Sequence, residues 1–269
     1  MTVASPAPAR PPRVRQPLLN AWIDDLTMDE LMGRLERGAL FTLNPNHLYY
    51  LQRDRHFEAA YSRAEFVTCD SGYLFWALRL MGRRIRARLA GSDIVPAFCR
   101  HHCDDPAVRI FLLGAASGVA QRALERINAR TGRDICVGAH GPSMNFVNDE
   151  AEIQTVLHMI EGSGATVLIV GLGAPKQEIW IDRYRGALPQ VRIFMGVGAT
   201  IDYEAGVVAR APLWMRRMGL EWLYRVVTDP RRYLLRYARD AGFLWLVLLD
   251  ALGLYKGPSF SNGSRTSKS

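Results

Sequence analysis

The stretch VRIFLLGAASGVAQRALERINART, residues 108–131, indicates the fold class most clearly. An apolar run over Val108–Leu113 predicts a buried strand, the glycine-rich segment 114–118 predicts a tight turn, and Val119–Thr131 has a helical pattern. The same order of strand, glycine-rich turn and helix returns from Thr166–Val170 onward. Strands that alternate with helices in this way favour a parallel or mostly parallel sheet with helices on both faces.

Apolar runs and turn residues on either side of this stretch predict the rest of the core. Further strands are expected at Ala39–Leu43, Glu65–Thr68, Asp134–Ala139 and Val191–Met195. Further helices are expected at Met28–Arg37, Leu48–Ala64, Tyr73–Met81, Asp93–His101 and Glu150–Ser163. Together they predict an α/β core of Rossmann-like type over residues 18–205, in which a ligand would bind beyond the carboxyl ends of the strands.

The composition supports a folded core and excludes several classes of protein. The chain has 269 residues, of which 49% are apolar and 22% charged, which is typical of a globular protein and not of a disordered chain. Its four cysteines do not make a disulfide scaffold, and no apolar run reaches the about 18–20 residues that span a bilayer. The N-terminus lacks the apolar core of a signal peptide, so a cytoplasmic location is expected.

The positive charge is concentrated in two segments of the chain. The formal net charge is +8, yet residues 1–20 carry three arginines without an acid, and residues 210–239 carry eight arginines against two acids. The remainder is therefore close to neutral. A near-neutral body with one concentrated basic segment predicts an anionic partner at that segment, although a solvated helix face would also carry such charge. The same distribution argues against a nucleic-acid-binding protein.

The two ends of the chain differ from the core in composition. Residues 1–17 hold five prolines and are expected to form an extended leader, and residues 257–269 are expected to form a disordered polar tail. Residues 206–256 predict a helical, basic and amphipathic appendage. Within it, FLWLVLLDALGL at Phe243–Leu254 is typical of a segment that lies in a membrane interface, and an ordinary core or oligomer-interface helix would have a similar composition.

Glycine-rich turns after the predicted strands are candidate phosphate sites. Glycine lets the backbone approach a phosphate closely, and the helix that follows offers N–H groups. On this ground Gly114, Gly171, Gly173 and Gly198 are candidate substrate-binding residues. The sequence contains neither the complete dinucleotide fingerprint nor a Walker lysine pattern, and plain tight turns would also explain these glycines.

Polar residues beside these turns are further candidates for substrate binding. Lys176, Gln177 and Glu178 open the helix that follows the turn at residues 171–175. Asp202 stands shortly after the glycine turn that ends the strand at Val191–Met195. These side chains would lie at the open end of the sheet, where ligands bind.

Asp70 is the candidate catalytic residue. It directly follows a short predicted strand, where a carboxylate can accept a proton from an attacking hydroxyl; it would serve equally well as the N-cap of the next helix. Thr42 and Asn44 stand at the end of another strand and would line the same cleft. The Asp-x-Asp pair typical of metal-held sugar nucleotides does not occur, so metal-independent chemistry with no metal site is expected.

Several ordered motifs of this chain are specific to one protein family. They are TLNPNH at 42–47, CDSG at 69–72, RLAGSDIV at 88–95, FLLGAASG at 111–118, GLGAPKQEIWIDRYR at 171–185 and GVGATIDYEAGVVARAPLWMRRMGLEWLYRVVTDPRRYLLRY at 196–237. Through these motifs the chain closely resembles the WecG/TagA/CpsF family of bacterial glycosyltransferases, from about residue 18 to residue 240.

The resemblance implies a reaction and a set of partners. It implies inverting, metal-independent transfer of a sugar from a UDP-sugar to a polyprenyl-diphosphate-linked acceptor, without a cofactor. Typical products are precursors of wall teichoic acid, common antigen or exopolysaccharide. The protein would then be peripheral on the inner face of the plasma membrane, and a homo-oligomer is a further hypothesis.

The resemblance also assigns roles to individual residues. Asp70 matches the catalytic base proposed for the family, and Thr42 and Asn44 match polar residues that line its active site. Residues of the family's other motifs and of its C-terminal appendage are matched here by Gln177, Arg88, Arg210, Arg225, Arg232 and Arg236. Some of these appendage arginines are thought to complete the site over the diphosphate.

Two other classes of function stay open at this point. A Rossmann-type nucleotide-dependent oxidoreductase would share the alternating sheet and the GLG turn, although the full fingerprint is missing. A non-catalytic membrane-associated scaffold of a polysaccharide pathway would share the basic appendage. The donor sugar and the acceptor glycan are not indicated by the sequence.

Overall fold

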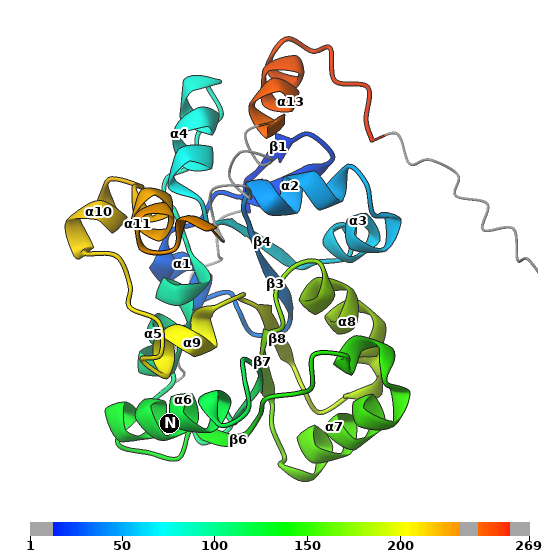
Figure 1. Ribbon diagram of the computed structural model, residues 1–269, viewed down its shortest axis with the longest axis vertical. Coiled ribbons are helices and arrows are strands. Elements are labelled where there is room, and N and C mark those ends of the chain that lie inside the picture. Colours follow the sequence, from blue (N-terminus) through cyan, green and yellow to red (C-terminus); the bar gives the residue numbers. More distant parts are fainter. Residues whose placement is uncertain (1–12, 232–241, 259–269) are drawn as a thin grey trace, which may run out of the picture.

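A computed structural model describes residues 13–231 and 242–258 and shows an α/β fold (Figure 1). The central sheet has six strands in the order β4-β3-β8-β7-β5-β6, and every neighbouring pair is parallel. These strands are β3 (Gly38–Leu43), β4 (Phe66–Cys69), β5 (Ile110–Gly114), β6 (Cys136–His140), β7 (Val167–Gly171) and β8 (Ile193–Gly196). The predicted sheet is confirmed, and each predicted strand overlaps an observed one.

Successive side chains of a strand lie in two different hydrophobic cores, one on each face of the sheet. In β7, Leu168 and Val170 pack in one core, and Val167 and Ile169 pack in the other. Side chains of a strand point alternately to opposite faces, so a strand covered on both faces is apolar at every position. This burial explains why the central strands are continuous apolar runs in the sequence.

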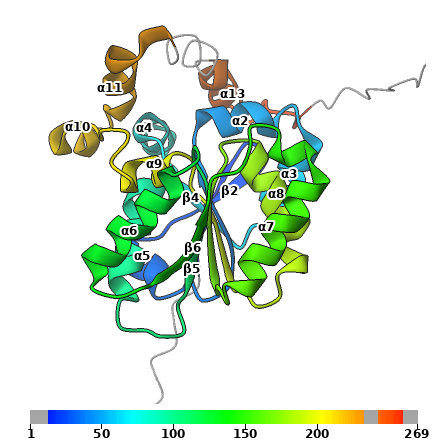
Figure 2. The same cartoon turned by 60° about the horizontal axis from the view of Figure 1, so that its bottom comes forward.

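Helices cover both faces of this sheet (Figure 2). One layer contains α2 (Pro45–Leu51), α3 (Arg55–Ser62), the short η1 (Phe146–Asn148), α7 (Glu150–Gly162), α8 (Lys176–Tyr184) and η2 (Arg185–Ala187). The other layer contains α1 (Met28–Met32), α5 (Gly91–His101), α6 (Val119–Thr131) and α9 (Thr200–Glu204). This arrangement leaves the carboxyl ends of the strands as the open edge of the core.

Four further helices gather at that open edge (Figures 1 and 2). They are α4 (Gly72–Leu80), α10 (Leu213–Arg217), α11 (Glu221–Thr228) and α13 (Gly242–Ala251). Three of them belong to the segment that we expected to form a helical appendage. In the described parts of the chain, no helix combines the length and the apolar character needed to cross a membrane.

An N-terminal hairpin was not predicted. Strand β1 (Arg15–Leu18) pairs antiparallel with β2 (Ala21–Asp24), so residues 15–17 belong to a strand and not to the extended leader in which we placed them. The Asp24 carboxylate accepts a hydrogen bond of 2.8 Å from the Val67 backbone N–H and thereby ties the hairpin to β4. This long-range contact has no counterpart in the local sequence pattern.

The helix predicted over Leu48–Ala64 is in fact two helices, α2 and α3. Asp54 has extended backbone angles, and its Oδ1 accepts hydrogen bonds from the backbone N–H groups of His56 (2.9 Å) and Phe57 (3.2 Å). An aspartate in this position caps the N-terminus of a new helix. The prediction ran one helix through the polar residues 52–56, although Asp54 within them was a visible start signal.

Candidate active site

A cleft at the carboxyl ends of the strands has two compartments that meet at three side chains. The turn compartment, of about 840 Å³, lies over the turns that follow β7 and β8. The helix compartment, of about 490 Å³, lies between the start of α2, α4 and α11. Asn44, Asp70 and Arg225 line both compartments.

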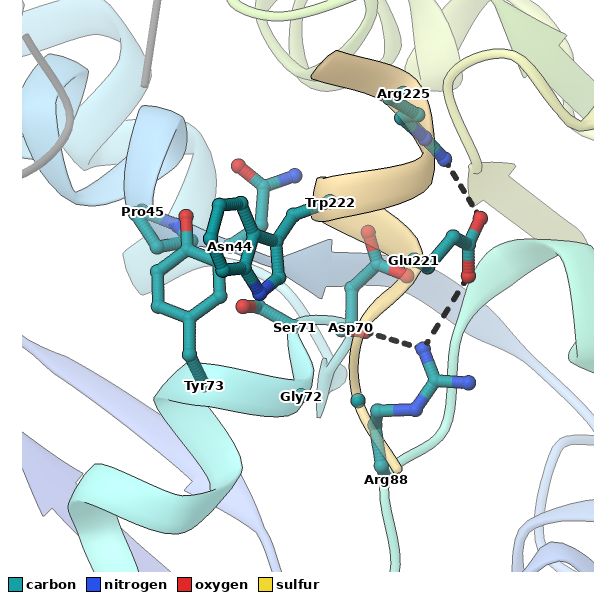
Figure 3. Close-up of a pocket in the computed structure, with 11 residues that line it drawn as sticks. Asn44, Pro45, Asp70, Ser71, Gly72, Tyr73, Arg88, Glu221, Trp222 and Arg225 are labelled. Carbon is teal, nitrogen blue, oxygen red and sulfur yellow. Dashed lines mark hydrogen bonds and ion pairs between the residues drawn. The ribbon is translucent and has the colours of Figure 1, made fainter. Parts of the chain in front are cut away.

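Asp70 stands where the two compartments join (Figure 3). Its backbone N–H donates to the Leu43 carbonyl at 2.9 Å, and its own carbonyl accepts from Arg88 Nη1 at 3.0 Å. Ser71 is the N-cap of α4, since its hydroxyl accepts from the Leu74 backbone N–H. The capping role that Asp70 could have had is therefore taken by its neighbour, and the Asp70 carboxylate faces the cleft.

The surroundings of Asp70 raise the pKa of its carboxyl group. Loss of hydration on burial is the largest cause, and the negative charge of Glu221 adds to it. The guanidinium groups of Arg88 and Arg225 and a hydrogen bond from the Asn44 side chain act in the opposite direction. A carboxylate with a raised pKa is a stronger base than an ordinary aspartate, which suits proton abstraction near neutral pH.

Asn44 connects Asp70 to a buried histidine that the sequence analysis missed. Asn44 is the N-cap of α2, and its Oδ1 accepts from the His47 backbone N–H at 3.3 Å. Its Nδ2 lies 3.3 Å from His47 Nε2, and His47 Nδ1 lies 2.6 Å from the Tyr61 hydroxyl. His47 is 4% exposed. The buried imidazole thus fixes the amide that contacts Asp70, and its place three residues after an Asn-Pro helix start is the signal that would have revealed it.

The side chain of Gln177 links the two glycine turns that follow β7 and β8. Its Oε1 accepts hydrogen bonds from the Gly173 N–H at 3.2 Å and from the Gly198 N–H at 3.1 Å, and its side chain is almost wholly buried. Gly173 and Gly198 both line the turn compartment. Because Gln177 accepts from both N–H groups, neither is available to a phosphate in this structure. Gln177 also lines the turn compartment, and its predicted contact with the substrate stays a prediction.

Other predicted substrate-binding residues lie off the cleft. Glu178 is fully buried and accepts from Gln177 Nε2 at 2.8 Å, whereas Lys176 is exposed and lines neither compartment. A Cβ at Gly114 would lie 2.6 Å from the backbone of Gly171, so this glycine serves the close approach of β5 and β7. Gly171 also borders the turn after β8, where its own Cβ would lie 2.8 Å from the Gly198 carbonyl oxygen.

The burial of Glu178 predicts an effect on stability that depends on pH. Burial raises the pKa of Glu178 from 4.5 to about 7, so the folded protein holds a proton that the unfolded chain releases above pH 4.5. The contribution of this proton to stability is complete below pH 4.5 and is lost as the pH rises through 7. Glu178→Gln should therefore raise the free energy of unfolding by about 3 kcal/mol at pH 8 and change it little at pH 4.

Thermal or urea unfolding at the two pH values measures this effect. The exposed Glu161→Gln on α7 is the matched control, because it removes the same charge from a solvated position. An equal change in stability at both pH values for Glu178→Gln would contradict the interpretation.

Several arginines lie near the place where the two compartments meet, on the side of the C-terminal appendage. Arg225 Nη2 donates to Glu221 Oε1 at 2.9 Å, and Arg88 Nη1 lies 3.8 Å from Glu221 Oε2 (Figure 3). Arg210 donates to the Ser92 carbonyl at 3.0 Å and to Asp93 Oδ1 at 2.9 Å. Arg210 thus braces α5 rather than lining the two compartments, whereas Arg225 lines both.

Aromatic side chains complete the cleft, and the sequence analysis did not select them. Tyr73 of α4 and Trp222 of α11 line the helix compartment with ring centres 6.3 Å apart. Tyr203 lines the turn compartment, and the guanidinium of Arg225 lies 5.7 Å from its ring centre. Their spacing along the chain gives no local signal, because the packing of α4, α9 and α11 brings them together.

Three predicted site residues are not among the described residues that line the cleft. Asp202 lines neither compartment, and its backbone carbonyl accepts from the Val207 N–H at 3.1 Å. Arg232 and Arg236 lie outside the described residues. Over the described ranges no three His, Cys, Asp or Glu side chains gather as a metal-binding group, and metal independence stays a prediction.

Comparison with known proteins identifies the family. Residues 16–257 match the family described as "Glycosyl transferase WecG/TagA/CpsF family". The chain belongs to this family. Among its relatives are two proteins named N-acetylglucosaminyldiphosphoundecaprenol N-acetyl-beta-D-mannosaminyltransferase. The one from Bacillus spizizenii is 32% identical over 73% of this chain and 74% of the relative, and the one from Bacillus subtilis is 29% identical over 80% of each. The resemblance inferred from the motifs is thus confirmed, and the chain is a glycosyltransferase by family.

Proposed function

We propose that the protein transfers a sugar, with inversion and without a metal ion, from a UDP-sugar to a polyprenyl-diphosphate-linked acceptor. The family and the names of the relatives support a glycosyltransferase of this kind. The observation that carries the proposal is the position of Asp70, whose carboxylate borders both compartments of the cleft. A transfer between two substrates needs a base that lies between them. A carboxylate that borders both compartments supports this role for Asp70.

The chemistry of the lining supports one substrate in each compartment. The turn compartment lies beyond the carboxyl ends of β7 and β8, where nucleotides bind in open parallel sheets, so it takes the UDP-sugar. The helix compartment is lined by Tyr73 and Trp222 near the exposed apolar helices, so it takes the lipid-linked acceptor. The reacting atoms then meet at Asp70.

The proposed reaction proceeds in one displacement. Asp70 removes the proton of the acceptor hydroxyl, and the oxygen attacks the anomeric carbon from the side opposite UDP. The bond between this carbon and the diphosphate oxygen breaks, and its electron pair remains on UDP. Arg225 stabilises the negative charge that grows on the diphosphate, which is often the largest contribution to catalysis.

The location follows from the acceptor. A polyprenyl-diphosphate acceptor resides in a membrane, so the protein would act as a peripheral protein on the inner face of the plasma membrane. Exposed apolar residues of α13, among them Trp245 at 63% exposed, support contact with a membrane interface. A homo-oligomer stays a prediction.

Product formation from defined substrates tests the proposal. The purified protein is offered a panel of UDP-sugars, beginning with UDP-N-acetylmannosamine, together with a polyprenyl-diphosphate-linked N-acetylglucosamine, and products are identified by mass spectrometry. We expect one donor to be transferred at an unchanged rate in excess EDTA, with inverted anomeric configuration. Transfer that EDTA abolishes would contradict metal independence, and no transfer from any donor would favour the scaffold. A rise in melting temperature with NADP would favour the oxidoreductase.

The dependence of activity on pH tests whether the charge of Glu221 affects the pKa of Asp70. Because Glu221 raises the pKa of Asp70, the base is lost by protonation as the pH falls through this raised pKa. Glu221→Gln removes the repulsion while keeping a hydrogen-bond acceptor for Arg225. The acidic limb of kcat/KM should therefore move to lower pH. The exposed Glu125→Gln on α6 should leave the limb in place, and a limb that Glu221→Gln also leaves unmoved would contradict the role of Asp70.

A further inference from the structure

Helix α4 carries an apolar and basic outer face that the cleft does not use. Leu74 and Leu78 are buried in the core, whereas Trp76 and Leu80, on the outer side, are 53% and 89% exposed. Arg79 stands between them, with its guanidinium 6.0 Å from the Trp76 ring centre. Large apolar side chains exposed four residues apart on one side of a helix are typical of a surface that binds a partner or a membrane.

The turn after α4 adds positive charge to this face. A cavity there is lined by four arginines. Arg83 pairs with Asp250 at 2.5 Å, and Arg86 pairs with Glu30 at 2.6 Å. Over the described ranges no acid pairs with Arg79 or Arg84, and both are exposed. Two uncompensated guanidinium groups beside Trp76 and Leu80 are complementary to the anionic headgroups and the apolar interior of a lipid bilayer.

Contacts with α13 place this face beside the mouth of the helix compartment. The ring of Phe243, from α13, lies 5.6 Å from that of Tyr73, which lines the compartment. The Arg83–Asp250 pair joins the turn after α4 to the same helix. The outer side of α13 exposes Trp245 and other apolar residues, and both helices stand at the same end of the molecule (Figure 1).

We propose that α4 and its following turn form a docking site for an anionic lipid bilayer, with Trp76 and Leu80 inserted into the interface and Arg79 and Arg84 on lipid phosphates. The docking site belongs to the core of the fold and not to the C-terminal appendage. It rests on the proposed function, because a bilayer at this position holds the helix compartment against the membrane that contains the acceptor.

Binding to lipid vesicles tests the docking site without turnover. The full-length protein is sedimented with vesicles of phosphatidylglycerol and phosphatidylcholine, and with vesicles of phosphatidylcholine alone. The double variant Trp76→Ser/Leu80→Ser should bind the anionic vesicles at least about tenfold more weakly, equal to about 1.4 kcal/mol. Arg79→Gln/Arg84→Gln should also bind more weakly, and its remaining binding should depend less on salt.

A matched control separates this face from a general loss of charge or apolar surface. Met159→Ser/Arg122→Gln removes an apolar and a basic side chain that are exposed on α7 and α6. It should bind vesicles like the unchanged protein. All variants should keep their melting temperature and should turn over a water-soluble acceptor with a short prenyl chain at the unchanged rate.

Three other outcomes would overturn the proposal. Unchanged vesicle binding by Trp76→Ser/Leu80→Ser would exclude α4 as a docking site. Displacement from vesicles by millimolar inorganic phosphate at constant ionic strength would indicate a site for a soluble anion. A change of oligomeric state in sedimentation velocity, without a change in vesicle binding, would indicate contact with a second copy of the chain. If no donor is ever transferred while vesicle binding depends on Trp76, the docking site stands and the proposed function fails.

Discussion

Asp70→Asn is expected to lower kcat by about 10³-fold, with a much smaller change in KM, if Asp70 is the base. The amide has the same shape as the carboxylate but cannot take the proton of the acceptor hydroxyl. Because the Asp70 backbone is held by Leu43 and Arg88, and an amide oxygen can still accept the hydrogen bond from Asn44, the substitution should leave the fold intact. Steady-state kinetics with the donor identified from the panel measures the effect.

The control for this variant is Asp104→Asn, which removes an exposed carboxylate outside the cleft. It should have unchanged kinetics. The pH profile provides a second readout: any remaining activity of Asp70→Asn should lack the acidic limb of the unchanged protein. A turnover within threefold of the unchanged protein would show that another group removes the proton.

The sheet could be predicted from the sequence because its strands carry a local signal. Thr166–Val170 is a run of apolar or β-branched residues bounded by glycine turns, and burial on both faces of a parallel strand gives this pattern. The N-terminal hairpin and the break between α2 and α3 at Asp54 could not be predicted in the same way. The hairpin depends on a contact with Val67, and the break depends on the cap that the Asp54 side chain makes within the polar residues 52–56.

The predictable part of the site consists of residues at strand ends. Asp70 and Asn44 follow two strands that turned out to be neighbours in the sheet, and Thr42 lies near the end of one of them, so their side chains meet at one edge. Glu178 and Gln177 follow a strand as well, yet the helix they open turns both side chains inward. A position at the carboxyl end of a strand indicates nearness to the cleft, while the direction of a side chain depends on the helix that follows.

Without the resemblance, the residues that α11 contributes to the site could not have been predicted from the sequence. Trp222 and Glu221 face Tyr73 and Arg88 because Gly219 and Gly72 allow the two backbones to touch. A Cβ at Gly72 would lie 2.3 Å from the Cα of Gly219. No local pattern shows that two glycines so distant in sequence meet. The net charge of this segment predicts an anionic partner, and this stays a prediction.

Arg225→Ala is expected to lower kcat by about 10²-fold, because it removes the guanidinium that borders both compartments. The charge on the diphosphate grows as its bond to the sugar breaks, and an interaction that strengthens in the transition state affects kcat more than KM. The N–H groups of Gly173 and Gly198 are occupied by Gln177, so they cannot replace the lost charge. Arg225→Lys should recover only part of the rate, since an ammonium lacks the forked geometry that matches two phosphate oxygens.

The exposed Arg231→Ala is the control for charge, because it lowers the net charge of the same appendage by the same amount and lies outside both compartments. Measured with a water-soluble acceptor, it should keep the rate of the unchanged protein, so that weaker membrane binding cannot be mistaken for weaker catalysis. If Arg231→Ala and Arg225→Ala reduce kcat equally, the appendage acts through its overall charge. If neither reduces kcat, the charge of the departing diphosphate is stabilised elsewhere and Arg225 has no catalytic role.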